Sequence, residues 1–287
     1  MDAKNKPTDR KVIMVTGGTS GIGKVGAMAL AKHCVSLILV GRNVEKGAAA
    51  VEEIKRESDN PNVEFMSTDL SSQDEVRRLV EGFQKRHDRL DVLVNNAGAF
   101  FLRRKESVDG IEMTFALNHL GYFLLTHLLQ DTIRASAPAR IINTASGAHH
   151  DTVIDFDDLQ ARRKYRMYKR YAESKLANVL FTYELARRLE ATEVAVNAFH
   201  PGFVATHIGE NNGWFVRLVK PLINLRAGSP EEGADTLVYL AISPEVAGVT
   251  GKYFYKRKAV PSSPNSYDET LADRLWRVSA ELTGIRD

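Results

Sequence analysis

The stretch Val12-Ile13-Met14-Val15-Thr16-Gly17-Gly18-Thr19-Ser20-Gly21-Ile22-Gly23-Lys24 decides the fold. It begins with an apolar, β-branched run typical of a buried strand, turns at a cluster of glycines and continues into an amphipathic stretch that reaches Lys32. Glycine is needed where the backbone turns tightly and approaches a pyrophosphate on a helix N-terminus, whose free N–H groups and dipole favour anions. The order strand, glycine turn, helix therefore predicts a dinucleotide site.

The turn taken alone is a weak signal. Its spacing, TGxxxGxG, differs from the GxGxxG form, and a lone glycine cluster also fits a simple strand-to-helix turn. The strand before it and the helix after it favour the dinucleotide interpretation. We expect cofactor contacts from Gly17, Thr19, Ser20, Gly21, Ile22 and Gly23.

Outward from this turn, short apolar runs alternate with amphipathic stretches. Seven strands are predicted: Val12–Thr16, Ser36–Gly41, Val63–Ser67, Val92–Asn95, Arg140–Thr144, Val194–Phe199 and Lys252–Tyr255. Because most of these runs are continuously apolar and are separated by helices, they predict a doubly wound α/β fold of the Rossmann type, with a seven-stranded parallel sheet and helices on both faces. Ser72 followed by Glu75, and Ser229-Pro230-Glu231-Glu232, mark two helix starts.

No composition break or repeat divides residues 1–287, so we predict a single domain. Two stretches, at about 148–170 and 206–227, fit the alternation poorly, and each follows the carboxyl end of a strand. Ligands of open α/β sheets bind at that edge, so these insertions are candidate pocket walls near the substrate. The apolar residues of 206–227 suit a flap over an apolar pocket and an interface or packing element equally well.

Composition describes an ordinary globular protein. Among 287 residues, 44% are hydrophobic and 26% charged, and the net charge of +3 is too small for a dedicated nucleic-acid binder. Cys34 is the only cysteine, which excludes an intrachain disulfide and favours a reducing compartment. The first apolar run, Val12 to Val15, is too short for a membrane span. We expect a cytoplasmic protein without a membrane span.

Arg42 indicates which nicotinamide dinucleotide binds. About 20 residues after such a turn, an NAD site usually supplies an acid for the ribose 2′-hydroxyl, whereas an arginine accommodates the 2′-phosphate of NADP. The sequence reads Val40-Gly41-Arg42-Asn43 there, with no acid. NADP(H) is therefore favoured, with Lys24 and Lys46 as secondary contributors to a positive pocket. The alternative is NAD(H), with Arg42 as a solvated surface charge.

Several motifs then occur in a family's order: Thr16-Gly17 through Gly21-Ile22-Gly23, Asn95-Asn96-Ala97-Gly98, Asn118, Ser146, Tyr171-Ala172-Glu173-Ser174-Lys175 and Pro201-Gly202. Over nearly the whole chain this series resembles the short-chain dehydrogenases/reductases. Leu117-Asn118-His119-Leu120-Gly121 and Ser174-Lys175-Leu176-Ala177-Asn178 resemble the retinol dehydrogenase-like branch. Members of that branch are commonly NADP(H)-dependent and often carry an N-terminal membrane anchor, which we do not expect here.

Tyr171 and Lys175 form the predicted acid–base pair. Residues four apart share one face of a helix, so both side chains point into one site. A nearby ammonium stabilises a phenolate, so we expect Lys175 to lower the pKa of Tyr171 toward neutrality, which would let Tyr171 act as general acid–base. Ser146, directly after the fifth strand, would hydrogen-bond the substrate oxygen and stabilise its developing charge. A structural turn serine is the alternative for Ser146.

The resemblance implies further roles. It implies that Lys175 contacts the nicotinamide ribose, that Asn118 supports a water-mediated proton relay to Lys175, and that Asp69 contacts adenine. Asp69 and Thr206 are equally plausible as caps of helices or turns. With Tyr171 and Lys175, the resemblance extends the cofactor site to Asp69, Leu70, Asn95, Ala97, Gly98, Pro201, Gly202, Val204 and Thr206.

Other patterns compete with these. Tyr165 and Lys169 repeat the Tyr-x-x-x-Lys spacing, but in a basic stretch that is unsuited to packing inside the fold. His149 and His150 are adjacent, yet no local motif supplies a third ligand, so we predict no metal. The basic run 162–170 fits a solvated insertion better than a nucleic-acid patch.

Two functions from different classes follow. The first is an oxidoreductase acting on a small-molecule substrate, an apolar aldehyde, ketone or alcohol, and the second is an NADP(H)-binding sensor on the same fold without turnover. The set Ser146, Tyr171 and Lys175 favours the enzyme, because a sensor has no need of an acid–base pair. A sugar-nucleotide epimerase would more often show TGxxGxxG. Homo-oligomers are common in the family, but no residue fixes the number of subunits, the substrate, the stereospecificity or the reaction direction.

Overall fold

The computed structural model describes residues 11–202 and 228–286. It contains one eight-stranded sheet with the order β3-β2-β1-β4-β5-β6-β7-β8. The strands are β1 (Val12–Thr16), β2 (Ser36–Gly41), β3 (Val63–Ser67), β4 (Val92–Asn95), β5 (Ala139–Thr144), β6 (Val194–Phe199), β7 (Lys252–Tyr255) and β8 (Lys258–Ala259). The first seven are parallel, as predicted, and β8 is an added antiparallel edge strand, paired through Phe254 to Ala259 and Tyr255 to Lys258. The prediction of seven strands missed it because two residues carry no periodic pattern.

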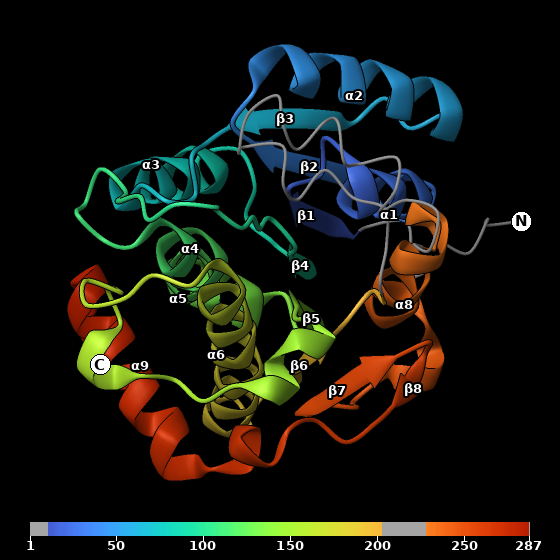
Figure 1. Cartoon of the computed structure of the whole chain (residues 1–287). Helices are drawn as coiled ribbons and strands as arrows, with labels where there is room; N and C mark the ends of the chain where they lie inside the picture. Colours follow the sequence, from blue (N-terminus) through green and yellow to red (C-terminus); the bar gives the residue numbers. More distant parts are fainter. Residues whose placement is uncertain (1–10, 203–227, 287) are drawn as a thin grey trace, which may run out of the picture.

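Helices cover both faces of this sheet (Figure 1). One face carries α1 (Gly21–Ala31), α2 (Val44–Ser58) and α8 (Pro230–Ile242). The other carries α3 (Gln73–Gln84), α5 (Gly121–Ala135) and α6 (Met167–Arg188), with α9 (Glu269–Thr283) packed outside α6. Each central strand alternates between the two cores: Ile13 and Val15 pack toward α1, whereas Val12 and Met14 face α3 and α5. This arrangement confirms the doubly wound α/β fold.

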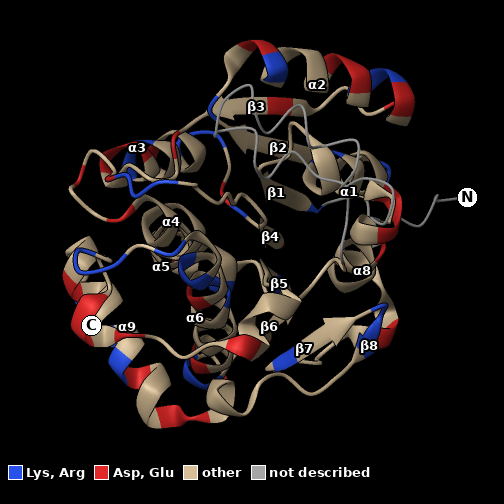
Figure 2. Ribbon diagram, viewed as in Figure 1, with Lys and Arg blue, Asp and Glu red and all other residues tan. Residues whose placement is uncertain are grey.

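Local sequence signals explain several helix starts. The Ser72 hydroxyl accepts the N–H of Glu75 at 3.4 Å, and the Ser229 hydroxyl accepts the N–H of Glu232 at 3.2 Å, as expected of N-caps. The Glu75 carboxylate reaches the N–H of Asp69 at 2.6 Å, which ties the end of the β3–α3 connection to the helix. Figure 2 shows acidic and basic residues interleaved along α2 and α9, while the central strands are nearly free of charge.

The fold brings the functional residues to one edge. The order of the strands reverses between β1 and β4, and ligands of such sheets bind at the carboxyl ends of the strands beside that reversal. The glycine turn after β1 and the segment after β4 meet there, and the ends of β5 and β6 lie next to them. In the ranges 11–202 and 228–286 no helix is long and apolar enough to cross a bilayer.

Candidate active site

The glycine turn lies directly against the end of β4. Gly17 has a φ of +66°, and a Cβ there would stand 2.9 Å from the Cα of Ala97. A Cβ on Gly23 would stand 2.3 Å from the carbonyl oxygen of Gly17. The hydroxyl of Thr16 accepts the N–H groups of Asn96 and Ala97, at 2.8 and 3.1 Å, and joins the two segments. Gly17 and Gly23 are therefore required by close approach of neighbouring protein atoms, and the contacts of the glycine turn with a pyrophosphate stay a prediction.

The N-terminus of α1 has the character of an anion site. Ser20 is its N-cap residue but makes no side-chain cap hydrogen bond, and no acidic residue lies in the first turn. The side chains of Asn43, Ser72 and Ser229 do cap α2, α3 and α8. The first N–H groups of α1 thus point out of the glycine turn without a side-chain acceptor, which fits the pyrophosphate of a dinucleotide.

Arg42 stands at the carboxyl end of β2, with its side chain 47% exposed. Its Nη1 lies 3.7 Å from Oδ2 of Asp69, so the two cofactor-binding candidates face each other. Lys24 differs from the prediction, because its Nζ lies 2.5 Å from Oε2 of Glu53 on α2. That ion pair, between residues far apart in the sequence, directs Lys24 to α2. Lys46 is exposed in the first turn of the same helix.

Other predicted cofactor residues have structural partners. Asp69 accepts the N–H of Ser71 at 3.0 Å and so closes a turn, one of its two anticipated roles. Leu70 is buried, and its carbonyl oxygen would lie 2.6 Å from a Cβ on Gly121. Asn95 is fully buried and donates to the side chains of Thr126 and Asn143, both at 2.9 Å.

The assignment of Asn95 to the cofactor cleft is therefore not supported by its side chain, which lies inside the fold. It clamps β4 to β5 and to α5. The sequence could not reveal this, because strand side chains alternate between faces and the pattern Asn-Asn leaves open which of the two points inward.

Tyr171 and Lys175 lie on one face of α6 near its N-terminal end. Nζ of Lys175 lies 5.7 Å from the centre of the Tyr171 ring and donates to the carbonyl of Thr144 at 3.0 Å. Burial lowers the pKa of Lys175 to about 7. Burial also raises the pKa of Tyr171, although a hydrogen bond with Ser146 opposes the rise. The expected lowering of the Tyr171 pKa is thus wrong for this structure, because desolvation of the phenolate is the larger effect.

Asn118 lies in a π-helical turn, η2 (Ala116–Leu120), which precedes α5. Its Oδ1 accepts the N–H of Ala99 at 2.9 Å, and its Nδ2 donates to the carbonyl of Ala99 and to Oγ of Ser174. Ser174 in turn donates to the carbonyl of Tyr171 at 2.7 Å. A Cβ on Gly98 would lie 3.2 Å from Oδ1 of Asn118 and 3.5 Å from Nζ of Lys175. Gly98, Asn118 and Lys175 therefore converge.

A buried polar network that the sequence analysis missed supports Lys175. Asn178 donates to the same Thr144 carbonyl at 3.1 Å, and Thr182 donates to the carbonyl of Asn178. Asn143 donates to the hydroxyl of Thr182 at 3.0 Å and so connects α6 to β5. Asn178 and Thr182 follow Lys175 by three and seven residues, so a polar stripe within an apolar helix was the available signal.

The competing pair does not form a second site. Tyr165 precedes α6, and its hydroxyl donates to the carbonyl of Phe101 at 2.5 Å. Nζ of Lys169 lies 3.8 Å from Asp155 and 3.6 Å from Glu173. The two side chains are directed to different partners, so equal spacing in the sequence does not give equal geometry.

Ser146 begins the segment that follows β5. Ser146 is the N-cap of a short 3-10 helix, η3 (Gly147–Asp151), and its hydroxyl accepts the N–H of Ala148 at 3.3 Å. The Ser146 side chain lies near enough to the phenol to lower the pKa of Tyr171 against the effect of burial. Ser146 therefore has the structural role of a turn serine, and its hydrogen bond to a substrate oxygen stays a prediction.

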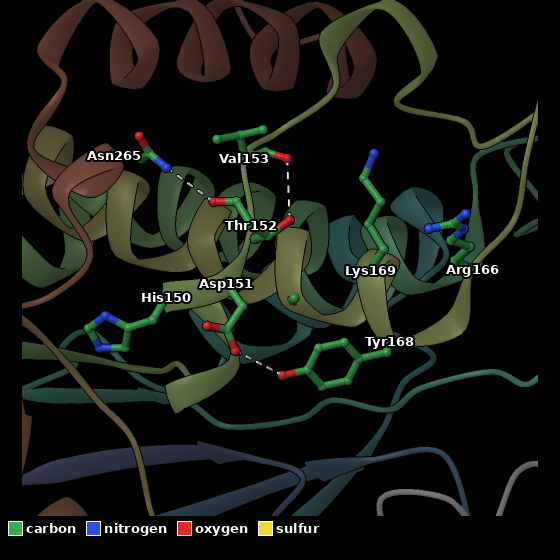
Figure 3. Close-up of a pocket in the computed structure, with 9 residues that line it drawn as sticks. His150, Asp151, Thr152, Val153, Arg166, Tyr168, Lys169 and Asn265 are labelled. Carbon is green, nitrogen blue, oxygen red and sulfur yellow. Dashed lines mark hydrogen bonds between the residues drawn. The ribbon is translucent and has the colours of Figure 1, made fainter.

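An open pocket of about 540 Å³ lies beside η3 and the first turns of α6. Its lining is His150, Asp151, Thr152, Val153, Arg166, Tyr168, Lys169, Ala172 and Asn265. In Figure 3 the hydroxyl of Tyr168 points toward Asp151, at 3.4 Å. All but Ala172 and Asn265 belong to the predicted insertion at 148–170. Across the described residues, His, Cys, Asp and Glu form no group of three that could hold a metal ion.

The segment after β6 is described only to Gly202. Gly202 has a φ of +85°, and its N–H donates to Nδ1 of His200 at 3.0 Å. Pro201 and Gly202 thus turn the chain at the carboxyl edge of the sheet. Val204, Thr206 and the predicted insertion 206–227 lie outside the described residues.

Comparison with known proteins identifies the relatives of this site. A family model described as short chain dehydrogenase matches residues 11–214. The chain is 43% identical to human retinol dehydrogenase 13, over 96% of this chain and 85% of that protein. It is 40% identical to human polyprenol dehydrogenase, over 98% of this chain and 87% of that protein.

A solved structure of an uncharacterized protein from Mycobacterium paratuberculosis shares the fold, with a TM-score of 0.79 and 29% identity over 100% of this chain and 98% of that one. The matched segment includes the glycine turn, Ser146, Tyr171 and Lys175. The chain therefore belongs to the short-chain dehydrogenase/reductase family, in its retinol dehydrogenase-like branch, and is an oxidoreductase that acts on CH–OH or carbonyl groups.

Proposed function

We propose that the protein is an NADP(H)-dependent oxidoreductase for an apolar aldehyde, ketone or alcohol. The observation that carries the proposal is the convergence of Ser146, Tyr171, Lys175 and Asn118 beside the glycine turn. A protein that only senses the cofactor has no use for a hydroxyl pair backed by a buried lysine. The enzyme therefore fits this geometry better than the sensor.

The side chains of the site suit proton transfer at a carbonyl oxygen. Bound nicotinamide supplies the hydride for the carbonyl carbon in the reducing direction. Tyr171 donates the proton, because its raised pKa keeps the phenol protonated at neutral pH. Ser146 donates a hydrogen bond to the same oxygen and stabilises its developing charge. Lys175, charged below about pH 7, adds a positive charge behind the phenol.

Asn118 orders this set from the other side. It joins the segment after β4 to Ser174, and Ser174 holds the backbone of Tyr171. These are fixed hydrogen bonds between buried groups, so the acid–base pair is positioned before any ligand binds. The relay of protons through Asn118 stays a prediction.

Arg42 supports NADP(H) over NAD(H). It faces Asp69 at the end of β2, where a 2′-phosphate would offer the guanidinium a doubly charged partner. We expect NADPH to be used more efficiently than NADH and Arg42→Asp to shift the preference toward NADH. Arg56→Asp, the same charge reversal in the last turn of α2, is the matched control. Equal efficiency of both cofactors with the unsubstituted protein would reject NADP(H).

An apolar substrate is supported by the names of the relatives, since retinol and polyprenol are both isoprenoid alcohols. A panel of aldehydes, ketones and alcohols of increasing chain length, assayed with NADPH or NADP⁺, tests the proposal. Higher kcat/KM for long apolar substrates is expected. Tight NADPH binding with no turnover across the panel would instead favour the sensor.

A cytoplasmic location and a homo-oligomeric state also stay predictions. Cell fractionation tests the first and sedimentation of the purified protein tests the second. Sedimentation also bears on the segment 206–227. An interface element predicts an oligomer, whereas a flap over the substrate requires none.

A further inference from the structure

His149 has a place next to Ser146 that the proposed chemistry does not use. It lies in η3, directly after β5, and its side chain is 0% exposed. Its ring packs against Tyr253 of β7, with 4.8 Å between the ring centroids, and against His150 at 4.0 Å. No metal group includes it within the described part of the chain. A buried imidazole at this position needs another explanation.

Both ring nitrogens of His149 have partners that define its protonation. The N–H of Ser263 points at Nε2 from 3.0 Å, and a backbone N–H can only donate, so Nε2 is the acceptor. The proton of the neutral ring is therefore on Nδ1. Nδ1 lies 2.7 Å from the carbonyl oxygen of Ser146, which can only accept. The ring is held as one tautomer that donates to Ser146.

The two bonds connect the Ser146 segment to α6 by a second route. Ser263 lies before a short 3-10 helix, η7 (Pro264–Tyr267), and its carbonyl accepts the hydroxyl of Ser266 at 2.6 Å. The hydroxyl of Ser266 meets that of Ser262, and Ser262 meets the hydroxyl of Tyr183 on α6 at 2.7 Å. Because α6 also carries Tyr171, these hydrogen bonds connect the segment that contains Ser146 to the helix that contains Tyr171.

We propose that His149 is a positioning residue for Ser146, an inference that rests on the proposed function. Its Nδ1–H fixes the Ser146 carbonyl, and the Ser263 N–H fixes the tautomer that makes this bond. The carbonyl accepts a second bond from the backbone N–H of His149 at 3.2 Å, so one residue determines the orientation of the Ser146 peptide. With the Ser146 peptide fixed, its side-chain hydroxyl stays directed toward Tyr171 and toward the position of the substrate oxygen.

A double-mutant cycle with Ser146 distinguishes positioning from general support of the fold. Ser146→Ala should lower kcat by about 10²-fold, as removal of a donor to a developing charge does. His149→Phe keeps the aromatic packing but removes both ring bonds, and should lower kcat roughly tenfold in the unsubstituted protein. In the Ser146→Ala background it should lower kcat less than about twofold, because no hydroxyl is left to position. Equal losses in both backgrounds would overturn the proposal.

Two conservative variants identify which bond matters. Asn at 149 can donate to the Ser146 carbonyl from a position close to Nδ1, whereas Gln reaches the position of Nε2 and can accept from Ser263. We expect His149→Asn to recover most of the kcat lost in His149→Phe, and His149→Gln to recover little, with NADPH affinity unchanged in all three. If kcat instead follows the melting temperature through the series, the role is structural and the proposal fails.

A variant at Ser263 avoids changing the histidine, in case the substitutions at 149 prevent folding. The φ of Ser263 is −62°, which suits proline, and its hydroxyl has no partner among the described residues. Ser263→Pro removes the N–H that defines the tautomer and places the proline Cδ in the direction of Nε2, so the ring must leave its position, and kcat should fall about threefold to tenfold. Tyr253→Phe is the matched control in the same ring cluster, because its hydroxyl also has no described partner. Unchanged kcat in Ser263→Pro would exclude the tautomer lock.

The same measurements keep the two proposals apart. If the unsubstituted protein turns over no substrate, the proposed function fails and the inference falls with it. If the protein is active but Ser146→Ala keeps its kcat, only the role of Ser146, and with it that of His149, is rejected.

Discussion

The two sides of the candidate site are built differently. On the cofactor side, the turn after β1 approaches β4 so closely that Gly17 and Gly23 leave no room for side chains, and the N-terminus of α1 carries no side-chain cap. On the acid–base side, buried side chains make the contacts: Lys175 is 2% exposed and Asn118 is 0% exposed. The cofactor side leaves the first N–H groups of α1 without a side-chain acceptor, whereas on the acid–base side Asn118 and Lys175 already hydrogen-bond to other protein groups.

Because of this difference, we expect cofactor affinity and kcat to depend on different residues. A backbone cradle can be altered only by changing its shape, which should affect cofactor affinity first. A network of side chains can lose one group without moving the rest, which should affect kcat while cofactor affinity is kept. Substitutions on the two sides should therefore split into two classes of kinetic behaviour.

Tyr171→Phe, on the acid–base side, should give the largest loss of kcat without a loss of NADPH binding. The ring keeps its packing and loses only the hydroxyl, so kcat should fall by about 10²–10⁴-fold while NADPH binding survives. Steady-state rates and NADPH fluorescence measure the two quantities. Tyr165→Phe, whose hydroxyl donates to the Phe101 carbonyl away from the site, should change kcat little. A Tyr171→Phe protein with near-normal turnover would show that the acid is elsewhere.

Gly23→Ala should give the complementary effect on the cofactor side. Its Cβ would stand 2.3 Å from the Gly17 carbonyl and 2.4 Å from Nδ2 of Asn96, so the turn must open. NADPH affinity should weaken by at least about tenfold, which is 1.4 kcal/mol. Gly82→Ala in α3, where a Cβ meets only the end of the Met66 side chain at 3.2 Å, is the control for glycine replacement as such. Unchanged NADPH affinity in Gly23→Ala would break the comparison between the two sides.

The sequence predicted the strands and the residues that meet in the site better than the contacts that hold them in place. The bounds of β1, β2, β3, β4, β6 and β7 agree with the predicted strands, and β5 begins one residue earlier, at Ala139. Continuous apolar runs and glycines are signals within a few residues of sequence, so they predict strands and turns without knowledge of tertiary contacts. The choice of Tyr171 over Tyr165 was also predictable, because only the former opens a long apolar-periodic helix.

Errors arose where the outcome depends on distant residues. Lys24 was expected at the cofactor, but Glu53, 29 residues later, binds it. The pKa of Tyr171 rises because burial, which no local pattern shows, outweighs its hydrogen bond. Asn143, Asn178 and Thr182 were missed because their roles depend on β5 and α6 lying together. Residue spacing identified the residues that converge in the site but not the network that holds them.

The pH dependence of the reduction should report the acid–base side. The pKa of Lys175 is lowered to about 7, so its ammonium is charged below pH 7 and loses its proton as the pH rises through that value. If the charge assists Tyr171, kcat/KM for NADPH should fall roughly tenfold between pH 6 and pH 8. Lys175→Arg keeps its charge over this range and should remove the decline, even if its overall rate is lower. A flat profile in the unsubstituted protein would mean that the lysine acts without its charge.

The smallest expected effect compares two serines at helix N-termini. Ser229 caps α8 through the N–H of Glu232, so Ser229→Ala should lower the free energy of unfolding by about 1 kcal/mol. Ser20 makes no such bond at α1, and Ser20→Ala should leave the unfolding free energy of the cofactor-free protein nearly unchanged. Urea denaturation of both variants measures the difference.

Addition of NADPH should reverse the order of the two variants. A ligand that binds only the folded protein stabilises it in proportion to its affinity, so a variant with weaker binding gains less. Ser20→Ala, at the mouth of the glycine turn, should gain less stability from NADPH than the unsubstituted protein, whereas Ser229→Ala should gain the same amount. If Ser20→Ala is destabilised without NADPH and gains normally with it, Ser20 is an ordinary cap. The N-terminus of α1 would then not be reserved for an anion.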